Sequence, residues 1–195
     1  TGVASQVGAI NLIVTALNMR APGMTLMRMP IFTWMALVVQ FLLLFSIPVI
    51  TVALFLLMFQ RNFGANFFSV EAGADPLLWQ HLFWLFGHPE VYIIAIPAFG
   101  VISQVIPAFS RKPLFGYTSM VYAMLVITIL AYLVWLHHFF TMGSGASVNS
   151  FFGITTMIIS IPTGAKIFNW LFTMYRGRIR FELPMLWTIG FMITF

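Results

Sequence analysis

The chain has 195 residues, of which 61% are hydrophobic and only 7% are charged, against about 25% charged residues in an ordinary soluble domain. This composition excludes a soluble globular protein and predicts a polytopic membrane protein embedded in a lipid bilayer. The net charge of +5 is spread over loops and does not indicate nucleic-acid binding, and the lack of cysteine excludes disulfides and thiolate metal ligands.

Hydrophobic segments follow one another along the chain, separated by glycine, proline and charged residues. They run from Val3 to Met19, Ile31 to Phe59, Leu77 to Ile106, Tyr117 to Met142, Ser150 to Met174, and from Leu183 onward. The pattern predicts an all-α transmembrane helix bundle of about six segments, the first and last of them truncated. We expect residues 1–195 to form a single transmembrane domain that is an internal fragment of a larger subunit.

Charged loops indicate how the bundle is oriented, because lysine and arginine near span ends accumulate on the cytoplasmic side. Most cations lie in alternate loops: Arg20 and Arg28, then Arg111 and Lys112, then Arg176, Arg178 and Arg180. The opposite loops carry only Arg61, and Lys166 falls inside a span. We therefore expect these three cation-rich loops to be cytoplasmic, in an integral protein of the bacterial inner membrane.

Three of the four histidines lie well inside predicted spans, where a polar group costs several kcal/mol unless it is paired or functional. His88 lies roughly 27 Å above the inner end of its span and His137 roughly 30 Å above the end of the next, so the two are expected to meet. The side chains of His137 and His138 point about 100° apart on a helix, so both can bind one ion only if the ion lies beside the helix between them. The third ligand must then come from another helix. The spacing predicts a three-imidazole copper or zinc site; the alternative is hydrogen-bonded packing histidines.

Several neighbours of His88 belong to the same predicted site. Tyr92 follows His88 by four residues and shares its helix face, and Trp84 lies one turn before it. Glu90 is two residues away and points to another face, which disfavours it as a ligand but suits proton exchange. His81, near the outer end of the span, is expected to be interfacial and not a ligand.

A row of polar residues is expected to rise from the cytoplasmic side toward this site. Ser103 lies at roughly 5 Å, Lys166 at 12 Å, Thr163 at 17 Å and Tyr92 at 21 Å from the inner face. Such a row is typical of a proton route. The alternative remains open that Ser103 and Thr163 hydrogen-bond to their own helices, and that Lys166 only extends to the inner interface.

Four stretches resemble, in order and spacing, signature segments of haem-copper oxidase subunit I. They are NMRAPGM (Asn18 to Met24), WLFGHPEVY (Trp84 to Tyr92), VWLHHFFTMG (Val134 to Gly143) and IPTGAKIFNW (Ile161 to Trp170). The resemblance covers essentially the whole chain, from the end of the family's fourth transmembrane helix to the start of its ninth. It implies a respiratory terminal oxidase that reduces oxygen to water and translocates protons.

The resemblance also assigns residues to the copper site. It implies that His88, His137 and His138 bind the copper of a binuclear centre, opposite a high-spin haem. Tyr92 resembles the tyrosine that the family joins covalently to its first copper ligand. Thr156 and Val91 match positions that line the copper site and the oxygen approach, with Trp84 beside them.

Proton transfer is implied by the same family pattern. Glu90 resembles the glutamate that ends one proton pathway, and Lys166, Thr163 and Ser103 match positions of the other. The axial haem ligands and the start of the Glu90 pathway are expected outside this window. An isolated fragment of this kind is therefore expected to be inactive without its parent subunit.

The electron donor and the protein class each leave an alternative. ADPLLWQHLFW (Ala74 to Trp84) resembles the cytochrome c oxidases, which we favour, whereas GSGASVNSFFGITTM (Gly143 to Met157) resembles the quinol oxidases. Other oxidase subunits and oxygen are the remaining expected partners. A metal or proton transporter, and a bundle with incidental polar residues, are the competing classes, because intramembrane His, Glu and Lys also mark ion paths.

Overall fold

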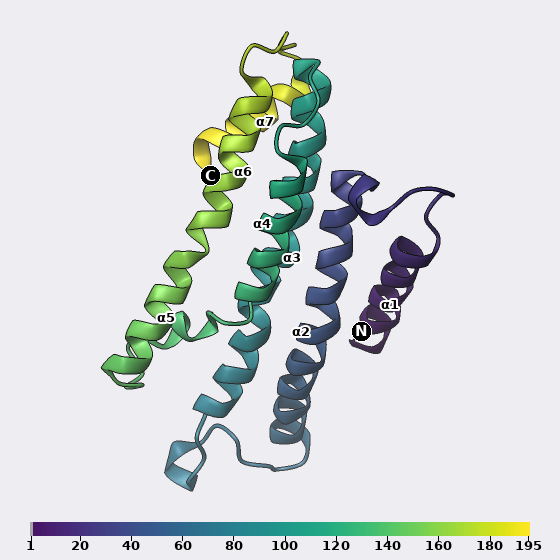
Figure 1. Cartoon of the computed structure of the whole chain (residues 1–195). Helices are drawn as coiled ribbons and strands as arrows, with labels where there is room; N and C mark the ends of the chain where they lie inside the picture. The colour runs from purple at the N-terminus through teal and green to yellow at the C-terminus, as the bar shows by residue number, and fades with distance from the viewer. Residues whose placement is uncertain (1) are drawn as a thin grey trace.

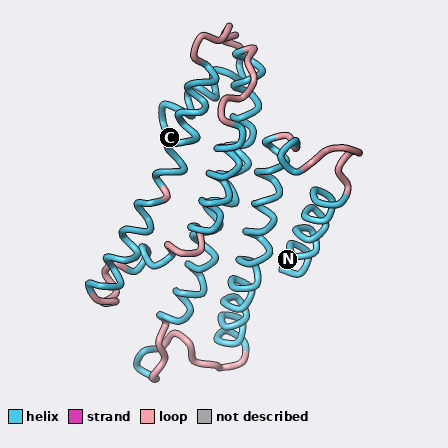
Figure 2. The backbone as a smooth tube through the Cα atoms, viewed as in Figure 1, coloured by secondary structure: helices cyan, strands magenta, loops and turns pink. Residues whose placement is uncertain are grey.

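The structure, a computed structural model, describes residues 2–195, and every regular element in that range is helical. The long helices are α1 (Gly2–Asn18), α2 (Ile31–Asn62), α3 (Leu77–Ser110), α4 (Tyr117–Leu130), α5 (Ala146–Ile158), α6 (Ser160–Met174) and α7 (Leu183–Thr194). Short 3-10 helices are η1 (Leu26–Arg28), η2 (Val70–Ala72) and η3 (Trp135–Phe139). Figure 2 shows helix along nearly the whole tube, which confirms the predicted all-α bundle.

Three stretches are long and apolar enough to cross a membrane by length and composition: α2, α3, and α5 together with α6. At about 1.5 Å per residue, the 32 residues of α2 extend about 48 Å, more than the roughly 30 Å hydrocarbon core. The helices α1, α4 and α7 are shorter and also apolar. The described part of the chain therefore has the dimensions of an integral membrane protein.

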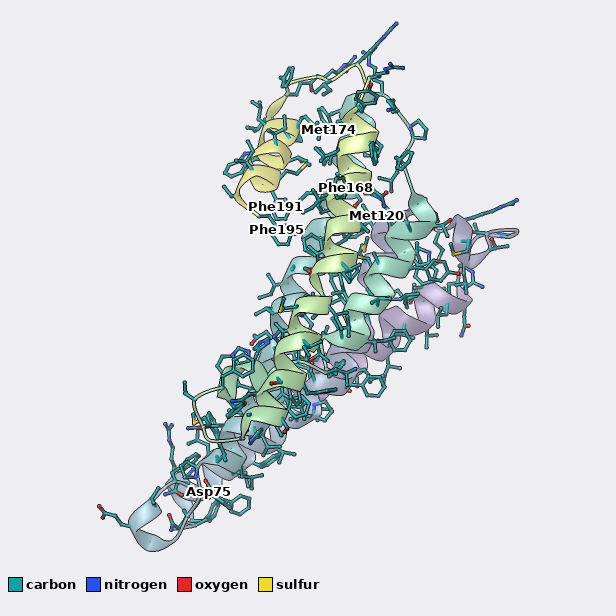
Figure 3. All side chains as sticks on the ribbon, turned by 60° about the vertical axis from the view of Figure 1, so that its left-hand side comes forward. Asp75, Met120, Phe168, Met174, Phe191 and Phe195 are labelled. Carbon is teal, nitrogen blue, oxygen red and sulfur yellow. The ribbon has the colours of Figure 1, made fainter. Side chains whose placement is uncertain are left out.

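The core lies where α2 and α3 run side by side, with α1 on one flank and α4 and α6 on the other (Figure 1). It is filled by aliphatic and methionine side chains, including Met35, Leu42, Ile96, Ile106, Met120, Met124 and Ile127. Tyr132 ties α4 to this core, since its hydroxyl donates to the Leu42 carbonyl at 2.6 Å. In Figure 3 Phe191 of α7 and Phe195 directly after it turn inward, and both rings contact that of Phe99 on α3.

Close approach of α2 and α3 depends on Gly100. A methyl group there would lie 2.9 Å from the Phe32 ring and 3.0 Å from the Met35 side chain. We therefore predict that Gly100→Ala destabilises the parent protein by about 1–3 kcal/mol through overpacking. Thermal unfolding in detergent measures the change. Gly153→Ala is the matched control, because nothing lies within 4 Å of that added methyl, and equal effects of both variants would contradict the prediction.

The loops rich in lysine and arginine lie toward one end of the bundle. Figure 1 shows the α3–α4 and α6–α7 loops together at the top, whereas the α2–α3 loop with Asp75 lies at the opposite end (Figure 3). Lys112 joins the two upper loops by donating to the carbonyls of Phe172 at 3.1 Å and Tyr175 at 2.5 Å. The backbone N–H of Arg178 adds a bond to the Ser110 carbonyl at 2.9 Å.

Two predicted segments differ from the structure. Residues 117–142 were expected to form one span, but α4 ends at Leu130 and residues 135–139 form the separate helix η3. The predicted segment from Ser150 to Met174 begins earlier, at Ala146, and is interrupted between α5 and α6. Pro162 explains the interruption, because its ring displaces the carbonyl four residues earlier, that of Ile158.

Candidate metal centre

Three histidines from two elements converge. His88 lies in the middle of α3, and His137 and His138 lie on η3, yet ligand-capable nitrogens of all three lie within 4.8 Å of one another. The Nε2 atoms of His137 and His138 are 3.1 Å apart. Ring centroids of His88 are 4.5 Å from His137 and 5.9 Å from His138. The group could hold one metal ion through three imidazoles.

The 3-10 geometry of η3 differs from the α-helix that the sequence predicted around His137. Residues of a 3-10 helix turn about 120° each, so consecutive side chains diverge at their roots. The two ring centroids are nevertheless only 4.4 Å apart, with the ring planes at 62° to each other, and the Nε2 atoms are close together. A separation of 3.1 Å suits two nitrogens bound to one ion at about 2 Å each.

The hydrogen bonds of His137 determine which nitrogen is free for a metal. The Thr156 hydroxyl donates its only hydrogen to the Phe152 carbonyl at 2.6 Å. Its oxygen, 3.0 Å from His137 Nδ1, therefore accepts a hydrogen from that nitrogen. His137 Nε2 then carries the lone pair, which is how an outer hydrogen bond selects the ligating nitrogen in metal sites.

The burial and missing hydrogen bond of His88 favour a metal ligand over a packing histidine. Its side chain is 6% exposed, and its Nε2 atom has no hydrogen-bond partner among residues 2–195. An unpaired buried polar atom costs about 1–3 kcal/mol, so a packing histidine would be expected to have found a partner. A bound ion would remove this cost for an imidazole cluster, and the donor set therefore fits copper or zinc.

Other predicted site residues lie at varied distances from the cluster. Trp84 stacks on His138 with ring centroids 3.6 Å apart, and Tyr92 lies 4.9 Å from His88 by the same measure. Glu90 is half-buried on another face of α3. Val91 is 52% exposed within the chain, so it does not join the cluster in this structure.

The two hydroxyls of the predicted proton route are bound within their own helices. Ser103 donates to the Phe99 carbonyl at 2.7 Å, and Thr163 donates to the Ile159 carbonyl at 2.9 Å. Ser103 also accepts the indole N–H of Trp170 at 2.9 Å. Both hydroxyls thus adopt the alternative bonding considered from the sequence, and either would have to rotate to pass a proton.

Lys166 is fully buried on α6 and does not extend to the interface. Its Nζ lies 3.5 Å from the centroid of the Phe99 ring and has no hydrogen-bond partner among the residues described. The sequence did not identify Phe99 as the neighbour of this lysine. The Phe99 ring also lies 5.9 Å from that of Trp170, which follows Lys166 by four residues and shares its helix face.

An apolar helix bundle that brings three histidines together and buries an unpaired lysine is a membrane protein with a candidate metal centre. The family described as Cytochrome C and Quinol oxidase polypeptide I matches residues 1–195. The chain therefore belongs to the haem-copper oxidase subunit I family, which confirms the resemblance found in its signature segments.

Relatives in bacteria share most of this sequence. Quinol oxidase subunit 1 of Bacillus subtilis (strain 168) is 60% identical over 194 residues, and ubiquinol oxidase subunit 1 of Acetobacter aceti is 58% identical over 195. Cytochrome c oxidase subunit 1 of Bacillus sp. (strain PS3) is 53% identical over 195. Each match covers 100% of this chain and 30%, 29% and 32% of the respective relative.

Membership in this family implies haem and copper, respiratory electron transport, and other subunits. The bacterial relatives and the long apolar helices agree with an integral protein of the inner membrane, as the sequence predicted. The chain spans about 30% of the length of its relatives.

Proposed function

We propose that this chain is a transmembrane domain of the catalytic subunit of a respiratory terminal oxidase, which reduces oxygen to water and translocates protons. The observation that carries the proposal is the cluster of buried His88 with partly buried His137 and His138. Family membership supports copper over zinc as its ion. Oxygen consumption by the purified parent, lost when copper is removed and restored when copper is added back, tests the proposal.

The three imidazoles would hold copper, which supplies a redox-active Lewis acid for oxygen chemistry. Thr156 fixes the His137 ring through its hydroxyl, and Trp84 lies flat against His138. The haem ligands are proposed to lie elsewhere in the parent, since three of the four histidines are assigned to copper and His81 accepts a hydrogen bond from Trp135.

Tyr92 is proposed to donate a proton and an electron at the copper site. Its ring lies 4.9 Å from that of His88 on the same face of α3. Lys166 would bring protons from the cytoplasmic end, along α6 and past Ser103 and Thr163. A serine or threonine hydroxyl both donates and accepts, so rotation away from its own carbonyl would open this route.

Glu90 is proposed to deliver protons by the second pathway. We predict that Glu90→Gln in the parent slows turnover by about a hundredfold while copper content stays normal, because a carboxamide keeps the shape but has no acidic proton. Oxygen consumption and metal analysis measure the two quantities. Exposed Glu71→Gln on η2 is the control and should match wild type. Loss of copper with normal proton uptake would reassign Glu90 as a ligand or structural support.

Quinol is proposed as the electron donor of the parent, because the relatives at 55–60% identity are named quinol or ubiquinol oxidases. Cytochrome c is the second candidate, favoured by the cytochrome c oxidase at 53% identity and by the stretch from Ala74 to Trp84. Oxygen consumption by the purified parent with ubiquinol and with reduced cytochrome c separates the two. Activity with cytochrome c alone would reverse our choice.

A further inference from the structure

The element that carries two of the three proposed ligands has little regular structure of its own. The helix η3 has five residues, follows a turn after α4, and is separated from α5 by another turn. A single 3-10 turn is not stable by itself, so its position depends on tertiary contacts. Residues outside η3 must therefore hold His137 and His138 in place.

One face of α3 provides these contacts. His81, Trp84 and His88 are spaced three and four residues apart and so share that face. The pairing along it is regular: His88 meets His137, and Trp84 stacks on His138. His81, two turns from His88, is the outermost member of this face.

His81 contacts η3 on both sides of the two histidines. The Trp135 indole N–H donates to His81 Nδ1 at 3.3 Å. The His81 ring also stacks on Phe139, with centroids 4.2 Å apart and planes 10° from parallel. Trp135 precedes His137 by two residues and Phe139 directly follows His138, so one side chain holds both ends of the ligand-bearing segment.

The chemistry of these contacts is specific to an imidazole. An indole N–H can only donate, so Trp135 requires an unprotonated acceptor nitrogen on His81. The same flat ring must be apolar enough to stack on Phe139, which is 1% exposed. Asparagine would supply the acceptor without the ring, and phenylalanine would supply the ring without the acceptor.

We propose that His81 is a positioning residue of the metal centre: it fixes η3, and thereby His137 and His138, against α3. This inference rests on the proposed copper site. Outer residues that orient metal ligands are worth about 10–100-fold in affinity. His81 acts through the backbone of η3 and not on a ligand directly, so the lower end of that range is expected.

The test uses the purified parent enzyme and measures how fast copper is lost to a Cu(I) chelator, with haem content and thermal stability recorded in parallel. His81→Phe and Trp135→Phe are each expected to release copper about tenfold faster while haem is retained. The double variant should be no faster than either single one, because both remove the same hydrogen bond. His81→Asn, which keeps an acceptor for Trp135, should recover part of the loss.

Trp79→Phe is the matched control. Trp79 also lies on α3 and also donates its indole N–H, in this case to the Ala53 carbonyl at 2.8 Å, away from the histidines. It should release copper at the wild-type rate. Acceleration equal to that of Trp135→Phe would mean general loosening of α3 and would overturn the proposal, as would wild-type rates in both His81→Phe and Trp135→Phe.

The outcomes separate this proposal from the proposed function. If the wild-type parent contains no copper, the oxidase assignment is contradicted. If it contains copper and His81→Phe and Trp135→Phe release copper at the wild-type rate, only the proposed role of His81 is contradicted. If His81→Phe does not assemble with haem, the rates at which Trp135→Phe and His81→Asn lose copper to the chelator test the role of His81 instead.

Discussion

Replacing His137 or His138 with alanine in the full parent subunit is expected to remove copper while the haems stay bound. Each change deletes one of three imidazoles whose nitrogens lie within 4.8 Å of one another, and the two that remain are expected to hold copper more weakly. Loss of a direct ligand should exceed the 10–100-fold cost of losing an outer partner, so about a hundredfold or more in affinity is expected. Metal analysis and the haem spectrum of the purified variants measure both quantities.

The control for these variants is Met142→Ala, an exposed change close to η3 that should keep full copper. Haem retention is expected because the haem ligands are proposed to lie outside this chain. Full copper occupancy in both His137→Ala and His138→Ala would contradict the assignment. Loss of haem together with copper would mean that the variants had misfolded, and His137→Gln, a smaller change of shape, would then be measured.

Lys166→Met is expected to fold and to bind haem and copper, yet to reduce its binuclear centre about a hundredfold more slowly. Lys166 is fully buried, and its Nζ lies 3.5 Å from the centroid of the Phe99 ring without a hydrogen-bond partner among residues 2–195, so packing alone does not explain it. Adding electrons to a buried site without compensating protons is electrostatically costly, and methionine keeps the stem but cannot carry a proton. Stopped-flow reduction of the high-spin haem measures the rate.

The matched control is Lys112→Met, the same change at the other lysine. Lys112 lies at the end of the bundle and donates to the last carbonyls of α6. The Lys112→Met variant should be slightly less stable and should reduce its binuclear centre at the wild-type rate. A wild-type rate in Lys166→Met would leave only a packing role for Lys166, with its charge held by Phe99.

Local pattern was enough to predict most of the bundle. Long apolar runs predicted α2 and α3, because a bilayer requires such runs, and the spacing of His88 and Tyr92 predicted a shared face. The contact between His88 and His137 was predicted from their similar depths in the bilayer, since both predicted spans cross the same membrane. These predictions need only helix geometry and the thickness of a membrane.

The helix η3 could not be predicted in the same way. Nothing between Tyr117 and Met142 is a proline or glycine, so the end of α4 at Leu130 has no local signal. The break depends on contacts distant in sequence, those of Tyr132 with Leu42 and of Trp135 with His81. Pro162 did carry a signal for the α5–α6 interruption, but membrane helices tolerate many prolines, including Pro48 within α2.

The carbon monoxide difference spectrum of the purified, reduced parent tests the central claim most directly. An oxygen-reducing centre at His88, His137 and His138 requires a haem with an open position facing the copper site. We predict a haem band that shifts when carbon monoxide is added. A parent that contains no haem, or whose haem does not respond, would contradict the oxidase assignment. The histidine cluster, Glu90 and Lys166 would then indicate a metal or proton transporter.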